Sequence, residues 1–166
     1  MKNKKGFTFM EVMVVVLIIA MLAAFAYPTY TKVIMKARIA DAFSLAGIVR
    51  EAQQRYFVVN GVGAYFPEFT NSHINGRTRL VKTEGVTVDG GQLIKKDRYY
   101  VYITNKGGEE PVTNGCINVE YKQNNAMLFK ITTHVEDSKI WCEEGEGITG
   151  ICNTIPSLET EATDCD

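Results

Sequence analysis

Two apolar patterns divide the chain, an unbroken run near the N-terminus and a periodic stretch after it. From Phe7 to Tyr27 every residue is apolar except Thr8 and Glu11. As a helix these positions span about 31 Å, enough to cross the hydrocarbon core of a bilayer. Beyond them, apolar residues recur at three- and four-residue spacing, which predicts one apolar helix face continuing to about Val59. These residues are Ala42, Leu45, Val49, Ala52, Tyr56 and Val59.

A helix from Phe7 to about Val59 is far longer than one small domain needs, because it would measure about 80 Å. Its first half is expected to protrude, while its C-terminal half packs on the rest of the chain. Pro28 lacks a backbone donor and crowds the carbonyl of Ala24, so a kink or local melting is expected there. The glycine-containing segment 60–63 is expected to end the helix.

Strand patterns become clear in the C-terminal half of the chain. Aromatic and β-branched residues predict a strand at 98–104, and alternation predicts strands at 116–122 and 126–133. A turn at 123–125 joins the last two, and 139–142 is a candidate fourth strand. Before these, only one or two short strands are expected, for example at Leu80-Val81 or Val86–Val88. A small antiparallel sheet with one face against the helix would give an α+β fold.

The charge balance gives no sign of a nucleic-acid-binding protein. The chain has 18 basic and 19 acidic residues. Loss of Lys2, Lys4 and Lys5 would leave 15 basic residues against 19 acidic ones, a net charge of −4. No basic stripe remains, so the tyrosines within 99–102 are better explained by sheet packing than by stacking on bases.

All four cysteines lie in the last third of the chain, at Cys116, Cys142, Cys152 and Cys165. They form no C-x-x-C pair and the two histidines lie far from them in sequence, which argues against zinc. Their even number beyond an export element favours disulfides formed in an oxidising compartment. Of the three possible pairings, Cys142–Cys152 and Cys116–Cys165 are favoured. The first closes a short loop, and the second ties the C-terminal tail to the sheet.

The sequence shows no evident catalytic, cofactor or metal site. No serine or cysteine has an evident base beside it, and no glycine-rich loop follows a strand to hold phosphate. Acidic residues near the C-terminus lack the D-x-D-x-D spacing of a calcium loop, so a solvated acidic tail is the better interpretation. They are Glu143, Glu144, Glu146, Asp164 and Asp166. A protein that is not an enzyme and needs no cofactor is therefore expected.

The carboxylate of Glu11 is costly within an apolar run. A charge deep in a bilayer costs about 2.5 to 3.5 kcal/mol on insertion scales, so such a residue is usually functional or paired. If the chain is cut between Gly6 and Phe7, a new α-amino group arises four residues before Glu11. In a packed array of identical helices, that amine would face the Glu11 of a neighbour and set the axial register.

The N-terminal motif resembles the class III signal of type IV pilins and of type II secretion pseudopilins. That signal is a short basic leader ending in glycine, then phenylalanine, with glutamate at the fifth mature position. Here these residues are Gly6, Phe7 and Glu11. Pro28 also falls where type IV pilins usually have a helix-kinking proline, and the likeness is strong over roughly residues 1–55. The resemblance implies that a prepilin peptidase cuts after Gly6 and methylates the amine of Phe7.

The expected organisation is a leader at 1–6, a transmembrane and assembly helix at 7–33, and a globular domain at 34–166. The expected function is structural: a single-pass precursor in the inner membrane that assembles with copies of itself or other pilins into an extracellular filament. Its expected partners are the prepilin peptidase and the inner-membrane assembly platform. Adhesion, twitching motility and DNA uptake stay open as roles. Two alternatives are a pseudopilin of a type II secretion system and a single-span anchored binding protein.

Overall fold

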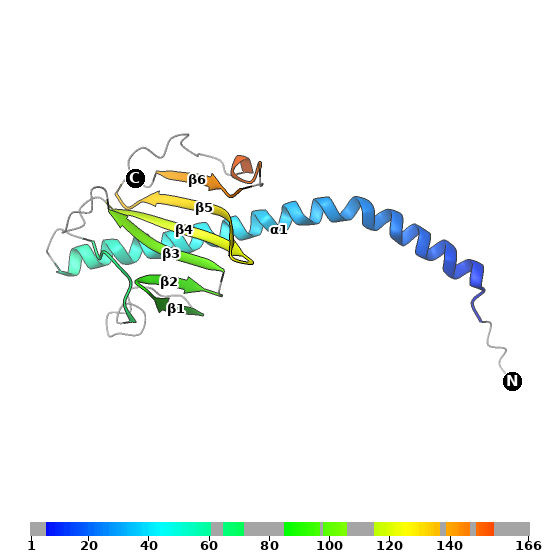
Figure 1. Ribbon diagram of the computed structural model, residues 1–166, viewed down its shortest axis with the longest axis horizontal. Helices are drawn as coiled ribbons and strands as arrows, with labels where there is room; N and C mark the ends of the chain where they lie inside the picture. Colours follow the sequence, from blue (N-terminus) through cyan, green and yellow to red (C-terminus); the bar gives the residue numbers. More distant parts are fainter. Residues whose placement is uncertain are drawn as a thin grey trace. The chain divides into compact units, whose positions relative to one another are not determined.

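The computed structural model describes residues 6–60, 65–71, 85–96, 98–105, 115–136, 139–146 and 149–154. In this part of the chain one long helix precedes one antiparallel sheet. The elements are α1 (Phe9–Asn60), β1 (Val86–Asp89), β2 (Gln92–Lys95), β3 (Tyr99–Asn105), β4 (Gly115–Gln123), β5 (Ala126–His134), β6 (Ile140–Glu144) and the 3-10 helix η2 (Cys152–Thr154). A long helix followed by an antiparallel sheet confirms the predicted α+β fold (Figure 1).

The chain divides into two compact units, 1–38 and 39–166, and α1 contributes to both. In the first unit, every described residue from 6 to 27 is exposed. In the second, the predicted apolar stripe is buried from Ala42 to Ala52. The prediction is wrong for the last residue of the stripe, Val59, which is 71% exposed. The final turn lies past the point where Tyr65 and Phe66 pack on the helix, against Phe57 and Tyr56.

The sheet places its strands in chain order, β1-β2-β3-β4-β5-β6, and each strand pairs antiparallel with the next (Figure 1). All the clearly predicted strands are present. The turn predicted at 123–125 is formed by Asn124 and Asn125, whose φ angles of 52° and 66° are left-handed, as a tight hairpin requires. The segment Leu80-Val81 lies outside the described residues.

The predicted acidic tail includes two residues that belong to the sheet. Glu143 and Glu144 belong to β6, which pairs with β5 as far as Phe129↔Glu144. Polar side chains ended the apparent strand pattern at 142, but the backbone hydrogen bonds of β5 extend it. The description of these two residues as a solvated tail is therefore corrected, whereas Asp164 and Asp166 lie outside the described residues.

The core of the second unit lies between one face of the sheet and the buried stripe of α1. Alternate residues of β3, β4 and β5 point to this face, as the pleat requires. Tyr99, Tyr121 and Phe129 form a row of ring contacts with centroids 5.0 and 5.3 Å apart. Two polar contacts add to the apolar packing: Asp41 pairs with Lys95 of β2 at 3.2 Å, and Arg50 donates to the carbonyl of Val135 at 2.8 Å.

Candidate functional site

The start of α1 is held by a reciprocal pair of side chains, Thr8 and Glu11. The Thr8 backbone N–H and its hydroxyl both donate to Oε2 of Glu11, at 2.8 and 2.9 Å. In return, the hydroxyl oxygen of Thr8 accepts from the Glu11 backbone N–H at 3.3 Å. This is a capping box, with Thr8 as the N-cap and Glu11 as the third helical residue. Sequence reasoning missed the role of Thr8, although the T-x-x-E spacing before an apolar run is its signature.

The predicted cleavage bond lies outside the helix. Gly6 and Phe7 have no helical assignment, and α1 begins two residues later, at Phe9. The Phe7 side chain is 88% exposed, and no other atom lies within 4 Å of the position that a Gly6 Cβ would occupy. An exposed, non-helical peptide bond is the geometry that a peptidase needs.

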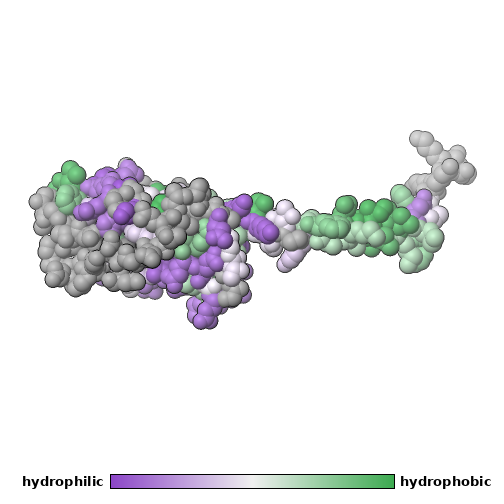
Figure 2. Space-filling model, turned by 90° about the horizontal axis from the view of Figure 1, so that it is seen from above, coloured by the Kyte–Doolittle hydropathy of each residue, from purple (hydrophilic) through white to green (hydrophobic). Residues whose placement is uncertain are grey.

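Between residues 7 and 27, apolar side chains cover the helix on nearly all sides. Large apolar residues between Phe7 and Tyr27 are 50% to 88% exposed, and Figure 2 shows this part of the helix as a hydrophobic surface. The helix contains a window with a mean hydropathy of 2.7, none of it buried, and is long and apolar enough to cross a membrane. An exposed apolar surface of this extent requires a cover, either lipid or other helices.

Pro28 lies inside α1, which is assigned as helix on both sides of it. Its side chain is outside the described part of the structure. The predicted kink at Pro28 therefore stays a prediction.

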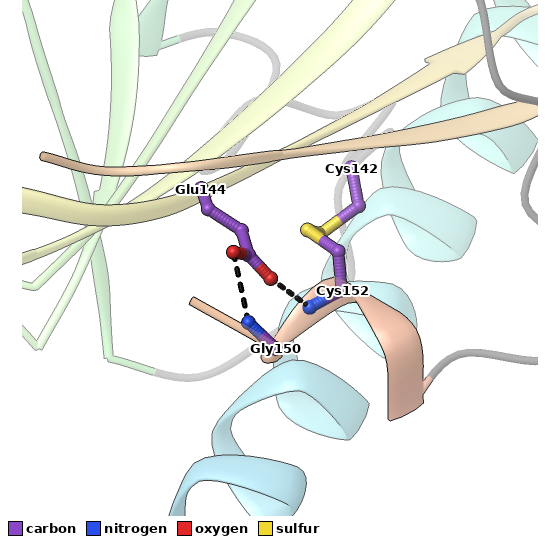
Figure 3. The surroundings of a disulfide bond; sticks show 4 residues. All are labelled: Cys142, Glu144, Gly150 and Cys152. Carbon is purple, nitrogen blue, oxygen red and sulfur yellow. Dashed lines mark hydrogen bonds between the residues drawn. A yellow bond between two sulfur atoms is a disulfide. The ribbon is translucent and has the colours of Figure 1, made fainter. Parts of the chain in front are cut away.

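The second candidate region is the disulfide loop after β6. Cys142 is bonded to Cys152, with Cα atoms 5.6 Å apart, which confirms this predicted pairing. Cys116 is also disulfide-bonded. Its predicted partner Cys165 lies outside the described residues, so that pairing stays a prediction. Beside the Cys142–Cys152 bond, the carboxylate of Glu144 accepts hydrogen bonds from the N–H groups of Gly150 and Cys152 (Figure 3).

A charged network occupies the sheet face opposite the core. Tyr102 donates to Glu120 at 2.7 Å, and Lys122 contacts the same carboxylate at 2.8 Å while lying 4.7 Å from the ring centre of Tyr100. Burial raises the pKa of Glu120, but hydrogen bonds from Lys122 and Tyr102 outweigh it and hold that pKa below its ordinary value. Burial, with the hydrogen bond to Glu120, raises the pKa of Tyr102. Tyr100 and Tyr102 thus take part in sheet contacts.

The described residues contain no group of three or more histidine, cysteine or acidic side chains arranged to hold a metal ion. The structure describes two sets of sequence-predicted site residues, one in each unit. Gly6 and Phe7 directly precede the capping box that contains Glu11, and Cys142 and Cys152 are bonded to each other beside the sheet.

Comparison with known proteins finds similarity to type IV pilins and other fimbrial proteins. Residues 1–27 match the prokaryotic N-terminal methylation motif. The type IV major fimbrial protein FimA of Dichelobacter nodosus is 29% identical over 98% of this chain and 96% of its own length. The fimbrial protein EcpC of Eikenella corrodens is 41% identical over 36% of this chain, and that match spans only 39% of EcpC. The type IV major pilin PilE1 of Neisseria gonorrhoeae is 30% identical over 62% of this chain and 50% of PilE1.

Proposed function

We propose that this relative of the type IV pilins, which carries the prokaryotic N-terminal methylation motif, is a structural subunit of a type IV pilus filament. In this proposal a prepilin peptidase removes residues 1–6 and methylates the amine of Phe7. The mature chain then assembles through α1. The observation that carries the proposal is the exposed apolar surface of the first unit, interrupted at its start by Glu11.

The apolar surface would be covered in two different ways, before assembly and in the filament. Before assembly, lipid would cover it, with Lys2, Lys4 and Lys5 retained on the cytoplasmic side of the inner membrane. In the filament, the same surface would be covered by α1 of other subunits. A contact between different faces of identical subunits generates a helical filament when its rotation does not close into a ring, and such a filament would extend outside the cell.

The capping box supports a specific role for Glu11. Both hydrogen bonds from Thr8 go to Oε2, which fixes the carboxylate at the helix start. Among the described contacts Oε1 makes no hydrogen bond, so it stays open to the amine of Phe7 on a neighbouring subunit. Pairing there would set the axial register. Removing one partner of a buried ion pair typically costs about 3 to 5 kcal/mol.

The decisive experiment measures sheared surface filaments and membrane-held subunit in cells producing Glu11→Ala. We expect stable subunit in the membrane with few or no filaments, because the unpaired amine is repeated at every contact. Glu51→Ala is the matched control: Glu51 is an exposed carboxylate on the same helix, paired with Arg55 at 2.8 Å, and its loss should leave the filament yield unchanged. A normal yield from Glu11→Ala would exclude register pairing.

Mass spectrometry of the N-terminus separates the alternatives. A methylated N-terminal Phe7 supports processing, whereas an intact Met1 favours a single-span anchored binding protein. A pseudopilin of a type II secretion system would also be processed. Deleting the chain distinguishes it, since a pilin deletion should remove surface filaments and a pseudopilin deletion should stop secretion of a folded enzyme. Adhesion, twitching motility and DNA uptake are then tested on the same deletion strain.

A further inference from the structure

Two side chains of β6 hold the same downstream segment. Cys142 and Glu144 are two residues apart in a strand and therefore point to the same face of the sheet. Cys142 reaches the segment covalently, through Cys152. Glu144 reaches it through two hydrogen bonds: its Oε1 accepts from the Cys152 N–H at 2.7 Å, and its Oε2 accepts from the Gly150 N–H at 3.0 Å. Figure 3 shows both connections beside one another.

The strand end that carries Glu144 is firmly held. Glu144 is paired with Phe129 in the β5–β6 register, and the next residue, Gly145, donates to the carbonyl of Leu128 at 3.0 Å. Gly145 is buried so closely against β5 that an added Cβ would collide with the backbone of Met127. The carboxylate of Glu144 therefore extends from a fixed point of the sheet, not from a free loop.

The segment that Glu144 holds is shaped to present its N–H groups. Gly150 has a φ of 81°, in the left-handed region, and Cys152 is the first residue of η2. Both N–H groups thereby face a single carboxylate. Hydrogen bonds to an ionised acceptor are roughly twice as strong as those between neutral groups. These two hydrogen bonds thus connect β6 to the loop independently of the disulfide, and one of them is donated by Cys152 itself.

We propose that Glu144 is a positioning residue for oxidative closure of the Cys142–Cys152 loop. In the reduced chain its carboxylate holds the backbone of Cys152, so that the two thiols lie beside each other before they react. Oxidation then removes two protons and two electrons from the thiols as the S–S bond forms, and a disulfide such as oxidised glutathione is reduced to two thiols. Less chain entropy is lost on closure, which favours the disulfide at equilibrium. This role goes beyond filament formation and does not depend on it.

The test is the thiol–disulfide equilibrium of the full-length protein in detergent micelles with glutathione buffers. Alkylation of free thiols followed by peptide mass spectrometry reports the Cys142–Cys152 bond and the Cys116 disulfide separately. In Glu144→Gln we expect the equilibrium constant for Cys142–Cys152 to fall about tenfold, the usual effect of losing a charged hydrogen bond. The Cys116 disulfide should keep its wild-type value. Glu143→Gln is the matched control, because Glu143 is exposed and pairs with Lys130 instead.

A second variant tests the same hydrogen bonds by changing a donor residue, Gly150, in place of the acceptor Glu144. Gly150→Ala keeps the carboxylate but strains the left-handed backbone that presents one N–H, and its Cβ would meet no other atom within 4 Å. Its Cys142–Cys152 equilibrium should shift in the same direction as that of Glu144→Gln. An equilibrium constant for Glu144→Gln within twofold of wild type overturns the proposal. Equal weakening of both disulfides, with a lower melting temperature of the oxidised protein, overturns it as well, because that pattern is general loss of stability.

Discussion

In the second unit, one buried polar side chain provides hydrogen-bond partners for the backbone of a loop residue. Gln53 is fully buried on α1. Its Nε2 donates to the carbonyl of Phe66 and its Oε1 accepts from the Phe66 N–H, both at 2.9 Å. The sequence does not reveal this role, because the partner is a loop backbone 13 residues away. Thr8 is different, since its capping partner is local and its spacing is readable.

Replacing Gln53 with Leu should strongly destabilise the second unit. The substitution places an apolar side chain of similar size in the core but leaves the buried N–H and carbonyl of Phe66 without partners, at a cost of about 1 to 3 kcal/mol each. Denaturant unfolding of the full chain in micelles, followed by the fluorescence of Trp141, measures the loss. Gln54→Leu is the control, because Gln54 is exposed on the next position. Equal stability of the two variants would contradict this role for Gln53.

Glu120 should make stability depend on acid pH. Its pKa is lowered in the folded chain from an ordinary value of 4.5, so its contribution is complete above about pH 4.5 and is lost as pH falls through the folded value. Glu120→Gln should therefore show a smaller loss of unfolding free energy between pH 7 and pH 3 than wild type. Tyr102→Phe, which removes one of the hydrogen bonds to this carboxylate, should reduce the loss in part. An unchanged acid loss in Glu120→Gln would refute the assignment.

At the scale of elements, periodicity predicts what long segments do and fails for short ones. Alternation identifies β4 and β5, which have nine residues each, and aromatic and β-branched residues identify β3, which has seven. Of the one or two short strands expected, the one suggested at Val86–Val88 is present as β1, but β1 and β2 have four residues each, too few for a clear period. The end of β6 was missed because strand pairing overrides the polar character of Glu143 and Glu144. The intrinsic preference of a residue for or against a strand has a smaller effect than backbone hydrogen bonds to a neighbouring strand.

Alanine substitutions at Gly145, which packs against β5, and at Gly47 should have sharply different effects on stability. Gly145→Ala should destabilise the protein by about 1 to 3 kcal/mol or more, because the new methyl group collides with the Met127 backbone, which cannot move without disturbing the sheet. Gly47→Ala should be neutral or stabilising by about 0.5 to 1 kcal/mol, since Gly47 lies in α1 with open space around its Cβ position. Thermal unfolding of both variants tests the pair. A Gly145→Ala protein as stable as wild type would show that β6 is loosely held.

At the scale of the whole molecule, the first thirty residues contain most of the readable functional information. Charge, an apolar run and the placement of Gly6, Phe7 and Glu11 are all local features, so one sequence suffices to identify them. The Glu144 contact is not readable in this way. It depends on a strand end and a left-handed glycine, Gly150, that come together only after the sheet has formed.

If residues 1–6 are removed as proposed, their removal should depend on Gly6. A peptidase must bring this exposed backbone into its site, and a β-branched side chain would obstruct that approach. Gly6→Val should leave an unprocessed precursor in the membrane, detected by its intact N-terminus and its larger mass. Met10→Leu, an apolar exchange inside α1, is the control and should be processed normally. Full cleavage of Gly6→Val would show that the small residue is not required.

The strand order of the sheet has a consequence for how the chain reaches its native state. Because every strand pairs with the one that follows it, each hairpin can zip up as soon as its second strand is available. Pairing between sequence neighbours closes short loops and is the fast class of folding event. In the proposed route across the membrane, α1 would be held in place first and the meander would grow outward from it. The Cys142–Cys152 bond would then form only after β6 has paired with β5, so it would mark a translocated chain whose sheet is complete.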